Sequence, residues 1–278
     1  MTALPGETHR KMGLVIDLDT CVGCHACVIA CKGWNDQGYG APLSDEDPYG
    51  PDVLGTFLNR VHAFEVVPDG HDGPISSFSC GEAAASGLPG HLAPPAQAKT
   101  VHFPKSCLHC EDAPCVTVCP TGASYKRVED GIVLVNEDDC MGCGLCAWAC
   151  PYGARELDLA AGVMKKCTLC VDRIYNETLA EEDRVPACVR TCPAGARHFG
   201  DLADPDSDVS RLVAERGGIG LMPEQETRPV NKYLPPRPRD SGGDAPALTP
   251  VATACGEEAA EGEMAPWLAW LDRTLERI

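Results

Sequence analysis

Aromatic side chains are scarce in this chain of 278 residues, because Phe, Trp and Tyr together make up only 5% of it. A large hydrocarbon core is therefore unexpected, and bound metal centres would supply cross-links that a thin core cannot. Basic residues are also few, 23 against 41 acidic ones, which gives a net charge of −18. This balance argues against nucleic acid or an anionic lipid surface as the main partner.

Long apolar runs are absent as well. No stretch approaches the roughly 18 apolar residues that a membrane-spanning helix needs. The N-terminal sequence MTALPGETHRKMG has neither the apolar region of a signal peptide nor a twin arginine. We therefore expect a chain that is not inserted or exported by a signal of its own, although a partner could carry it.

Cysteine, by contrast, is abundant, with 18 residues, of which all but Cys80 and Cys255 fall into four groups of four. The groups are Cys21, Cys24, Cys27 and Cys31; Cys107, Cys110, Cys115 and Cys119; Cys140, Cys143, Cys146 and Cys150; and Cys167, Cys170, Cys188 and Cys192. The third, CMGCGLCAWACP, has the spacing of bacterial [4Fe–4S] ferredoxins. In that pattern three thiolates bind one cluster, and the fourth binds another. We expect Cys80 to be a free thiol and Cys255 not to be a ligand.

Two other uses of cysteine compete with iron–sulfur clusters. A disulfide framework suits small secreted chains, and this chain matches them neither in length nor in having a signal peptide. Zinc sites use paired C-x2-C units but have no use for a third cysteine two residues later. A zinc-stabilised interaction protein is therefore the remote alternative. Because thiols must stay reduced until iron is inserted, assembly in the cytoplasm is expected.

Short elements are predicted around the cysteine groups. Strands are predicted at residues 14–18, 56–67 and 100–103, and helices at 28–34, in the insertion of the fourth group up to about 180, and at 206–215. Hairpins are predicted around Glu129-Asp130-Gly131 and around Ala160-Ala161-Gly162. A Cys-Pro-x-Gly-Ala repeat closes the last three groups, since proline stops a short helix and glycine permits the turn that follows.

Three further stretches carry weaker signals. Residues 68–99, rich in Gly, Pro, Ala and Ser, are typical of an exposed insertion loop, and residues 233–263 of a linker or disordered tail. Residues 265–278 predict an amphipathic helix that packs on this chain or on a partner subunit. His25 and His109 lie inside cysteine loops, where they either donate hydrogen bonds to clusters or are exposed. The basic residues that flank the groups, Lys166 among them, either raise cluster potentials by their charge or are solvated surface charges, and the second is the default.

Spacing leaves the pairing of the groups open. The second and third are separated by 20 residues that contain one hairpin, as in a two-cluster ferredoxin, which leaves the first and fourth to pair. By length alone the third and fourth could pair instead.

From residue 14 to residue 200 the four groups, in this order, resemble the four-cluster iron–sulfur subunits of the dimethyl-sulfoxide-reductase and polysulfide-reductase superfamily of molybdoenzymes. The segments APLSDEDPYG, GTFLNRVHAFEV, VHFPKSCLHC, MKKCTLCVDRIYN and RGGIGLMPEQETRPVNKYLPPR are most similar to the iron–sulfur subunits of sulfite dehydrogenases.

This resemblance implies an α+β fold of two nested ferredoxin-like units. The outer unit comprises residues 13–67 and 162–202, and the inner unit comprises residues 100–161. Residues 68–99 form an insertion, and residues 203–278 form a C-terminal extension. The implied ligand sets are Cys21, Cys24, Cys27 and Cys192; Cys31, Cys167, Cys170 and Cys188; Cys107, Cys110, Cys115 and Cys150; and Cys119, Cys140, Cys143 and Cys146. Some relatives lack the counterpart of Cys143 and carry a three-iron cluster; because Cys143 is present here, four [4Fe–4S] clusters are expected.

The resemblance also implies a function. The chain would relay electrons between a molybdopterin-containing catalytic subunit at its outer unit and a quinone-reactive membrane subunit at its inner unit. Sulfite oxidation is the expected reaction of the complex; related complexes act on dimethyl sulfoxide, polysulfide, formate or hydrogen. The expected location is the cytoplasmic face of the membrane, held there by a partner, with the periplasmic face possible by co-export. A free polyferredoxin is the other hypothesis. No residue of the chain is expected to be catalytic.

Overall fold

The computed structural model describes residues 2–35, 56–68, 99–237 and 248–251. The predicted insertion loop, the terminal helix at 265–278 and the two ungrouped cysteines, Cys80 and Cys255, lie outside these ranges. Within them, no helix combines the length and the apolar character that crossing a bilayer requires.

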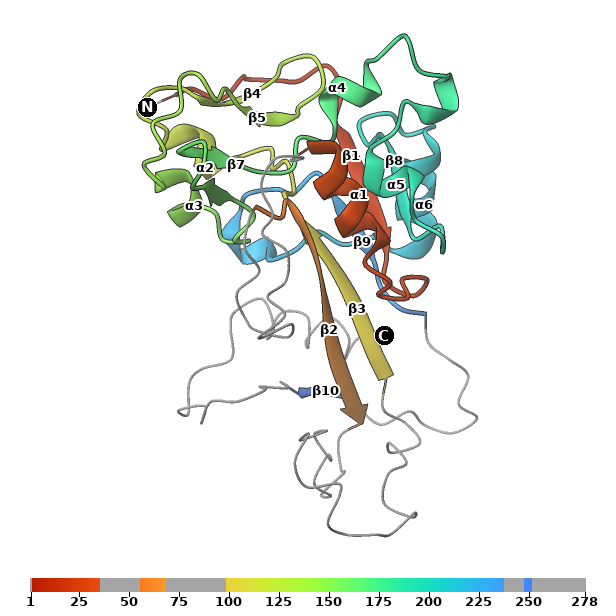
Figure 1. Ribbon diagram of the computed structural model, residues 1–278. Helices are drawn as coiled ribbons and strands as arrows, with labels where there is room; N and C mark the ends of the chain where they lie inside the picture. The colour runs from red at the N-terminus through yellow and green to blue at the C-terminus, as the bar shows by residue number, and fades with distance from the viewer. Residues whose placement is uncertain (1, 36–55, 69–98, 238–247, 252–278) are drawn as a thin grey trace.

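A three-stranded sheet, β8-β1-β9, brings together segments from both ends of the cysteine-rich region (Figure 1). Strand β1 (Met12–Asp17) pairs antiparallel with β8 (Arg197–Asp201) and parallel with β9 (Lys232–Leu234). Leu14 and Ile16 face the main core, whereas Val15 packs with Val209 on the other face. The strand predicted at 14–18 is therefore confirmed, and it is buried on both faces.

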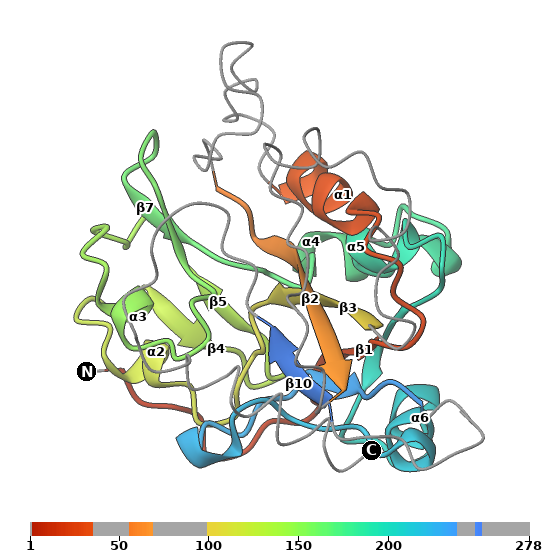
Figure 2. The ribbon, with the colours of Figure 1, turned by 90° about the horizontal axis from the view of Figure 1, so that it is seen from below.

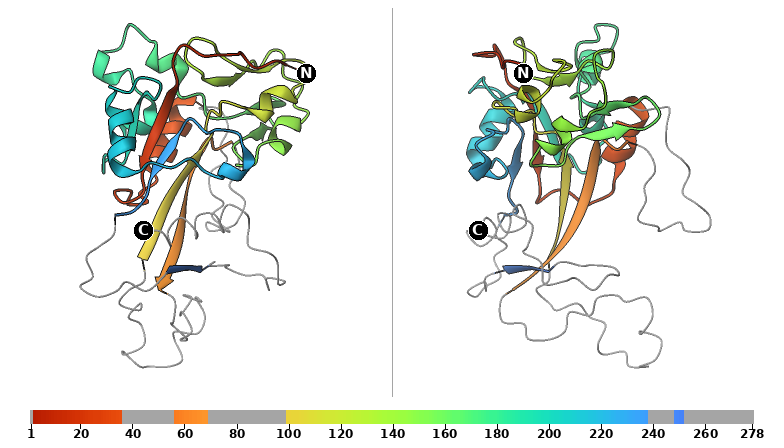
Figure 3. Two further views of the ribbon diagram at one scale, coloured as in Figure 1. Left: turned by 180° about the vertical axis from the view of Figure 1, so that it is seen from behind. Right: turned by 90° about the vertical axis from the view of Figure 1, so that its left-hand side faces the viewer.

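Two long strands project from the body that the cysteine loops form (Figures 1 and 3). Strands β2 (Asn59–Pro68) and β3 (Lys99–Ser106) pair antiparallel, and β10 (Leu248–Val251) adds to the free edge of β2. Phe103 of β3 stacks on Tyr233 of β9 with ring centroids 4.7 Å apart. This contact fixes the long hairpin to the central sheet. The strands predicted at 56–67 and 100–103 are confirmed as β2 and β3.

Both predicted short hairpins are present. Strands β4 (Ser124–Lys126) and β5 (Val133–Val135) form the first, and β6 (Glu156–Asp158) and β7 (Val163–Lys165) the second. Gly131 and Gly162 adopt φ values of 71° and 69°, so glycine relieves the left-handed turn in each hairpin.

A short helix follows each cysteine loop. These helices are α1 (Ala26–Asn35), α2 (Pro114–Thr117), α3 (Leu145–Trp148), α4 (Val171–Ile174) and α5 (Ala187–Arg190). In Figures 1 and 2, α2 and α3 lie on one side of the molecule with the short hairpins, and α1 and α5 lie on the other. The cysteine-rich region is therefore divided into two lobes around the central sheet.

The helix predicted at 206–215 is confirmed as α6 (Asp208–Arg216), which covers the outer face of the central sheet. Its first turn is capped by Ser207, whose Oγ accepts a hydrogen bond from the Ser210 N–H at 3.2 Å. Gly217, at φ 62°, ends it.

Two predictions about the C-terminal half are wrong. The helix expected to reach about residue 180 ends at Ile174, because the Asn176 side chain accepts hydrogen bonds from the backbone and hydroxyl of Thr178 and forms a turn instead. The proposed linker does not begin at Tyr233. Tyr233 and Leu234 are fully buried in β9, since β1 needs a partner on its second edge.

Candidate metal centres

Four cysteines from two distant groups line one buried cavity. Cys31, on α1, lies there with Cys167, Cys170 and Cys188 of the fourth group. Burial raises the pKa of the Cys31 thiol, and the three neighbouring thiols raise it further. Buried thiols that share one cavity resist ionisation together, so a positively charged group among them is the arrangement that favours the thiolates.

A second cavity repeats this pattern in the other lobe. It is lined by Cys140, Cys143 and Cys146 of the third group and by Cys119, the last cysteine of the second. Three cysteines again come from one loop and the fourth from the end of another group.

The remaining cysteines gather in the same way. Burial raises the pKa of Cys110 to about 12, and the neighbouring Cys107, Cys115 and Cys150 thiols add to the rise. Burial likewise raises the pKa of Cys21, and Cys27 and Cys192 contribute. The structure therefore brings Cys150 to the second group and Cys192 to the first.

Left-handed backbone turns shape the cysteine loops. Gly142 has φ 64°, and a Cβ atom there would lie 2.3 Å from the Gly162 carbonyl oxygen, so no larger residue fits. Leu169 and Cys170 adopt positive φ without being glycine, at 54° and 50°. Such strained residues persist where the surrounding structure overdetermines them, often at functional sites.

Hydrogen bonds point at several of the sulfurs. The Ser124 N–H donates to Cys119 Sγ at 3.3 Å, and the Ala196 N–H donates to Cys192 Sγ at 3.3 Å. Asn35 Nδ2 lies 3.5 Å from Cys170 Sγ. Burial acts to raise the pKa of Cys119, but the hydrogen bonds from Ser124 and Thr121 outweigh it and lower that pKa. Donors of this kind stabilise thiolates and tune iron–sulfur clusters.

Three buried basic side chains lie among the cysteine sets. Arg155 lines the Cys119 cavity, Arg197 lines the Cys31 cavity, and both are at least nine-tenths buried. Lys166 is buried too, so its prediction as solvated surface charge is wrong; its Nζ donates to the carbonyl oxygens of Val133 and Cys167. The signal available in the sequence was an arginine directly after two copies of the Cys-Pro-x-Gly-Ala repeat.

The two loop histidines differ. His25 is exposed, whereas His109 is fully buried and its Nδ1 accepts a hydrogen bond from the Val133 N–H at 3.1 Å. Burial, and then the charges of Lys166 and Lys126, hold the pKa of His109 well below 6.5. His109 is therefore neutral, with its proton on Nε2.

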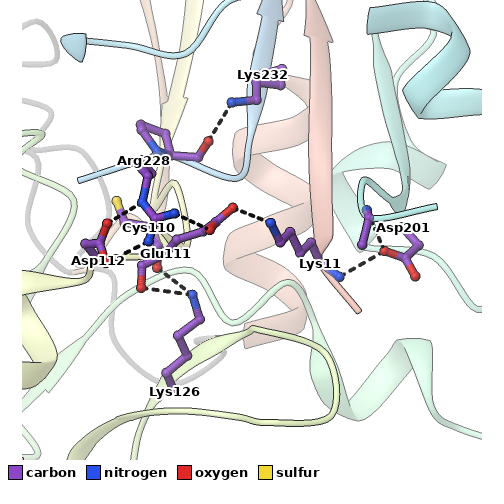
Figure 4. Close-up of polar contacts among 10 residues, drawn as sticks. Lys11, Cys110, Glu111, Asp112, Lys126, Asp201, Arg228 and Lys232 are labelled. Carbon is purple, nitrogen blue, oxygen red and sulfur yellow. Dashed lines mark hydrogen bonds and ion pairs between the residues drawn. The ribbon is translucent and has the colours of Figure 1, made fainter. Parts of the chain in front are cut away.

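An ion-pair network fixes the loop of the second group to the rest of the protein (Figure 4). Glu111 pairs with Lys11, which precedes β1, at 2.7 Å, and with Arg228, which precedes β9, at 3.2 Å. Lys126 Nζ donates to the carbonyl oxygens of Cys110 and Glu111 at 2.9 and 3.2 Å. Segments from the start and the end of the described residues thus hold this loop in place.

Neighbouring sets are close enough to influence one another. Burial raises the pKa of Cys188, and Cys27 of the adjacent set adds to it. Burial also raises the pKa of Cys167, to about 12, and Cys107 of the other lobe contributes. Of the sixteen cysteines in the described ranges, Cys24 and Cys143 are the exposed ones. The helices that follow their loops, α1 and α3, lie on opposite sides of the molecule (Figure 2).

The sets are too open for a single metal ion. Among the described residues, no three His, Cys, Asp or Glu side chains are close enough to hold one ion. Four thiolates around one zinc would lie about 3.8 Å apart, given Zn–S bonds of about 2.3 Å. A larger, multinuclear group with one cysteine at each corner suits sets that do not close around one ion and that receive hydrogen bonds at sulfur.

Comparison with known proteins agrees with this chemistry. Residues 98–202 match the family model of a 4Fe-4S dicluster domain, and residues 18–40 match that of a 4Fe-4S binding domain. The chain is 54% identical over 241 residues to a subunit of the sulfite dehydrogenase of Allochromatium vinosum, covering 87% of this chain and 90% of that protein. It is 38% identical over 239 residues to a putative dimethyl sulfoxide reductase iron-sulfur subunit of Halobacterium salinarum, covering 80% of this chain and 78% of that protein. It is 34% identical over 226 residues to one of the chains of the polysulfide reductase of Wolinella succinogenes, covering 81% of this chain and 95% of that protein.

Proposed function

We propose a function that proceeds from one premise: this protein belongs to the family of iron–sulfur beta subunits of molybdoenzymes related to dimethyl sulfoxide reductase. It is an electron-transfer subunit, and its sixteen grouped cysteines hold four [4Fe–4S] clusters in the four sets that the family resemblance implies. Bound clusters of this kind supply one-electron redox chemistry. The protein's own contribution is to space the four sets, to exclude water from the inner ones, and to direct hydrogen bonds at the sulfurs.

The observation that carries this proposal is the shared, serial arrangement of the cysteines. Each set has three cysteines from one group and a fourth from another group, so no group supplies all four ligands of a cluster. Cys27 and Cys188 connect the first two sets electrostatically, and Cys167 and Cys107 connect the lobes. A series in which exposed cysteines occur only in the two terminal sets suits electrons that enter at one end and leave at the other.

We assign the two lobes to nested ferredoxin-like units. The outer unit comprises residues 13–67 and 162–202, the inner unit residues 100–161, and residues 203–278 form an extension. Support comes from the antiparallel pairing of β1 with β8, which joins the segment before the first group to the segment after the fourth. Within the inner unit β4 pairs with β5, and β6 pairs with β7, the first strand of the segment that follows.

Two partners dock at the ends. At the outer end, the exposed cysteine Cys24 has two exposed apolar neighbours, Val22 and Ile29. At the inner end, Cys143 lies between Met141 and Leu145, both exposed, and the Trp148 side chain is 86% exposed. Contiguous exposed apolar side chains of this kind mark protein interfaces. We assign the outer end to a molybdopterin-containing catalytic subunit and the inner end to a quinone-reactive membrane subunit, which holds the chain at the cytoplasmic face of the membrane.

Sulfite is the proposed substrate of the complex. The 54% identical relative is named as a sulfite dehydrogenase subunit, whereas the relatives named for dimethyl sulfoxide and polysulfide reduction are 38% and 34% identical. Sulfite and water together give sulfate, two protons and two electrons, and the chain passes the two electrons singly to quinone.

The test is purification of the intact complex under anaerobic conditions. We expect about sixteen irons per chain, as four [4Fe–4S] clusters require, together with molybdenum and sulfite-dependent reduction of a quinone analogue. Activity with dimethyl sulfoxide but not sulfite would overturn the substrate and leave the relay intact. Zinc in place of iron would overturn the relay itself. A free polyferredoxin would instead elute from native extract as a lone species of 29.5 kDa.

A further inference from the structure

Two buried arginines occupy equivalent places in the two lobes. Arg155 follows Cys150-Pro-Tyr-Gly-Ala, and Arg197 follows Cys192-Pro-Ala-Gly-Ala, so each stands five residues after the last cysteine of its group. Arg155 is 6% exposed and Arg197 is 4% exposed. An arginine that is always protonated is rarely buried unless something of opposite charge faces it.

Neither guanidinium pairs with a carboxylate among the side chains that the structure describes. Arg155 Nη2 donates to the neutral hydroxyl of Ser124 at 2.8 Å, and Arg197 Nη2 donates to the neutral amide of Asn59 at 2.9 Å. Arg155 Nε and Nη1, and Arg197 Nη1, are buried without a hydrogen-bond partner in the described part of the chain. Leaving several charged donors unpaired in a core costs several kcal/mol in general, so the fold has a reason to keep them.

Cysteine sulfurs surround both side chains. Arg155 lines the cavity of Cys119, Cys140, Cys143 and Cys146. It is also close to the neighbouring set of its lobe, because Cys115 and Cys107, together with Cys146, raise the pKa of Arg155 against the effect of burial. Arg197 lines the cavity of Cys31, Cys167, Cys170 and Cys188, and Cys188 and Cys27 raise its pKa in the same way. Each arginine therefore faces both sets of its own lobe.

We propose that Arg155 and Arg197 are the buried counter-ions of the two cluster pairs, each one sharing its positive charge between two neighbouring clusters and raising the reduction potentials of both. This inference rests on the proposed function, since it requires bound clusters. A cluster with four thiolates is an anion that gains a further negative charge on reduction, and a fixed cation in a medium of low dielectric constant favours the reduced form. The unpartnered nitrogens then face cluster or cysteine sulfur, which accepts their hydrogen bonds.

The repeat explains why the two lobes share this feature. Proline and glycine after the last cysteine turn the backbone past the sulfurs, and the fifth residue is carried inward, as Arg155 directly before β6 and as Arg197 at the start of β8. The second group has Ser124 at that place, and Ser124 holds Arg155. The repeat therefore places one arginine in each lobe.

The test is a redox titration of the purified complex, followed by electron paramagnetic resonance, for Arg197→Gln, Arg197→Lys, Arg155→Gln and Arg155→Lys. We expect Arg197→Gln to shift the midpoint potentials of the two outer clusters to more negative values and to leave the two inner ones in place. Arg155→Gln should do the reverse. Each Lys variant should keep most of the wild-type potential, because it keeps the charge.

Arg190→Gln is the matched control. Arg190 stands two residues from both Cys188 and Cys192, but its side chain is 58% exposed and it pairs with Asp183 at 2.6 Å. Solvent screens that charge, so its removal should leave all four potentials unchanged.

Iron and acid-labile sulfide are measured in every sample, so that two kinds of failure can be distinguished. Wild-type protein without clusters would overturn the proposed function. A full set of clusters with unshifted potentials in both Gln variants would overturn only the counter-ion role. If a Gln variant loses clusters, the Lys variant decides: full loading at near-wild-type potential supports the role of charge, and equal loss in Lys and Gln refutes it.

Discussion

Arg155 reaches back to Ser124, its own counterpart in the preceding repeat, and donates a hydrogen bond to the Ser124 Oγ at 2.8 Å. The same serine uses its backbone N–H to bond Cys119 Sγ at 3.3 Å. One residue thus positions both a sulfur and a buried cation of the inner lobe. The second and third cysteine groups are joined through this contact as well as through their crossed cysteines.

Removing the Ser124 hydroxyl should weaken the inner lobe. In Ser124→Ala a third nitrogen of the buried guanidinium loses its partner, and we expect a loss of about 1–3 kcal/mol in stability. The measurement is the temperature at which the visible cluster absorbance is lost, in anaerobic holoprotein. Thr178→Ala is the control, because Thr178 is exposed and the loss of its hydroxyl, which bonds Asn176, should change nothing measurable. An unchanged melting temperature for Ser124→Ala would contradict the stabilising role of this contact.

Asn231 should be among the most sensitive polar residues of the chain. It is fully buried, its Oδ1 accepts from the Leu14 N–H at 2.8 Å, and its Nδ2 donates to the Cys107 carbonyl oxygen at 2.9 Å. Asn231→Leu leaves both backbone groups unsatisfied, at about 1–3 kcal/mol each. We expect early thermal loss of cluster absorbance, whereas Gln225→Leu, at an exposed position, should melt close to wild type. Equal melting of the two variants would show that Asn231 does not join the lobes.

The Asp17–Arg216 pair should stabilise the outer lobe without pH dependence near neutrality. Burial acts to raise the pKa of Asp17, but hydrogen bonds from Thr20, Arg216 and the Asp19 N–H hold it below its usual 3.8. Because a depressed carboxyl pKa contributes stability above the unfolded value and loses it only as pH falls, the contribution is complete at neutral pH. Arg216→Met should therefore cost about 1–3 kcal/mol, with the same difference from wild type at every pH from about 6 to 9. A difference that varies across this range would assign the effect to another group.

Replacing Cys143 should change one cluster and spare the rest. Because relatives that lack this cysteine carry a three-iron cluster, Cys143→Ala should lower the iron content by about one atom per chain, and one inner-lobe signal in the paramagnetic resonance spectrum should become that of a three-iron cluster. Cys80→Ser and Cys255→Ser are the controls, since both cysteines are predicted not to be ligands. Loss of iron in either control would show that the grouping into four sets of four is incomplete.

Trp148 should matter for assembly rather than for clusters. In Trp148→Glu we expect normal iron content but loss of the membrane partner during purification, because a charge replaces a large apolar contact at the proposed inner end. Ile29→Glu should instead release the catalytic partner at the outer end. Both partners staying bound in both variants would overturn the assignment of the two ends.

Local sequence signals predicted most of the elements around the cysteines. The glycine turns at Gly131 and Gly162 predicted both short hairpins, and the repeated cysteine spacing predicted where the short helices follow. What the sequence did not indicate depends on distant contacts. Tyr233 lies in a proline-rich stretch, and its burial follows from β1 needing a partner and from Phe103 offering a ring to stack on.

The buried charges were missed for a related reason. Arginine and lysine are usually surface residues, so the sequence did not indicate that Arg155, Lys166 and Arg197 are buried. The folding of the two lobes around these side chains removes them from water. The pairing of the cysteine groups was likewise open from spacing alone, and the positions of Cys31 among the fourth group and Cys119 among the third are what the structure adds.

The pairing of β1 with β8 has a consequence for synthesis. Met12 opposes Asp201 and Ile16 opposes Arg197, so the first strand emerges from the ribosome long before its neighbour exists. The short hairpins, by contrast, join residues close in sequence and are free to form during translation. Folding should thus proceed from the middle of the chain outward, and the cysteines of the first group, although synthesised first, should be the last to be enclosed. The nascent N-terminal region therefore depends on a reducing environment until the ribosome has passed Asp201.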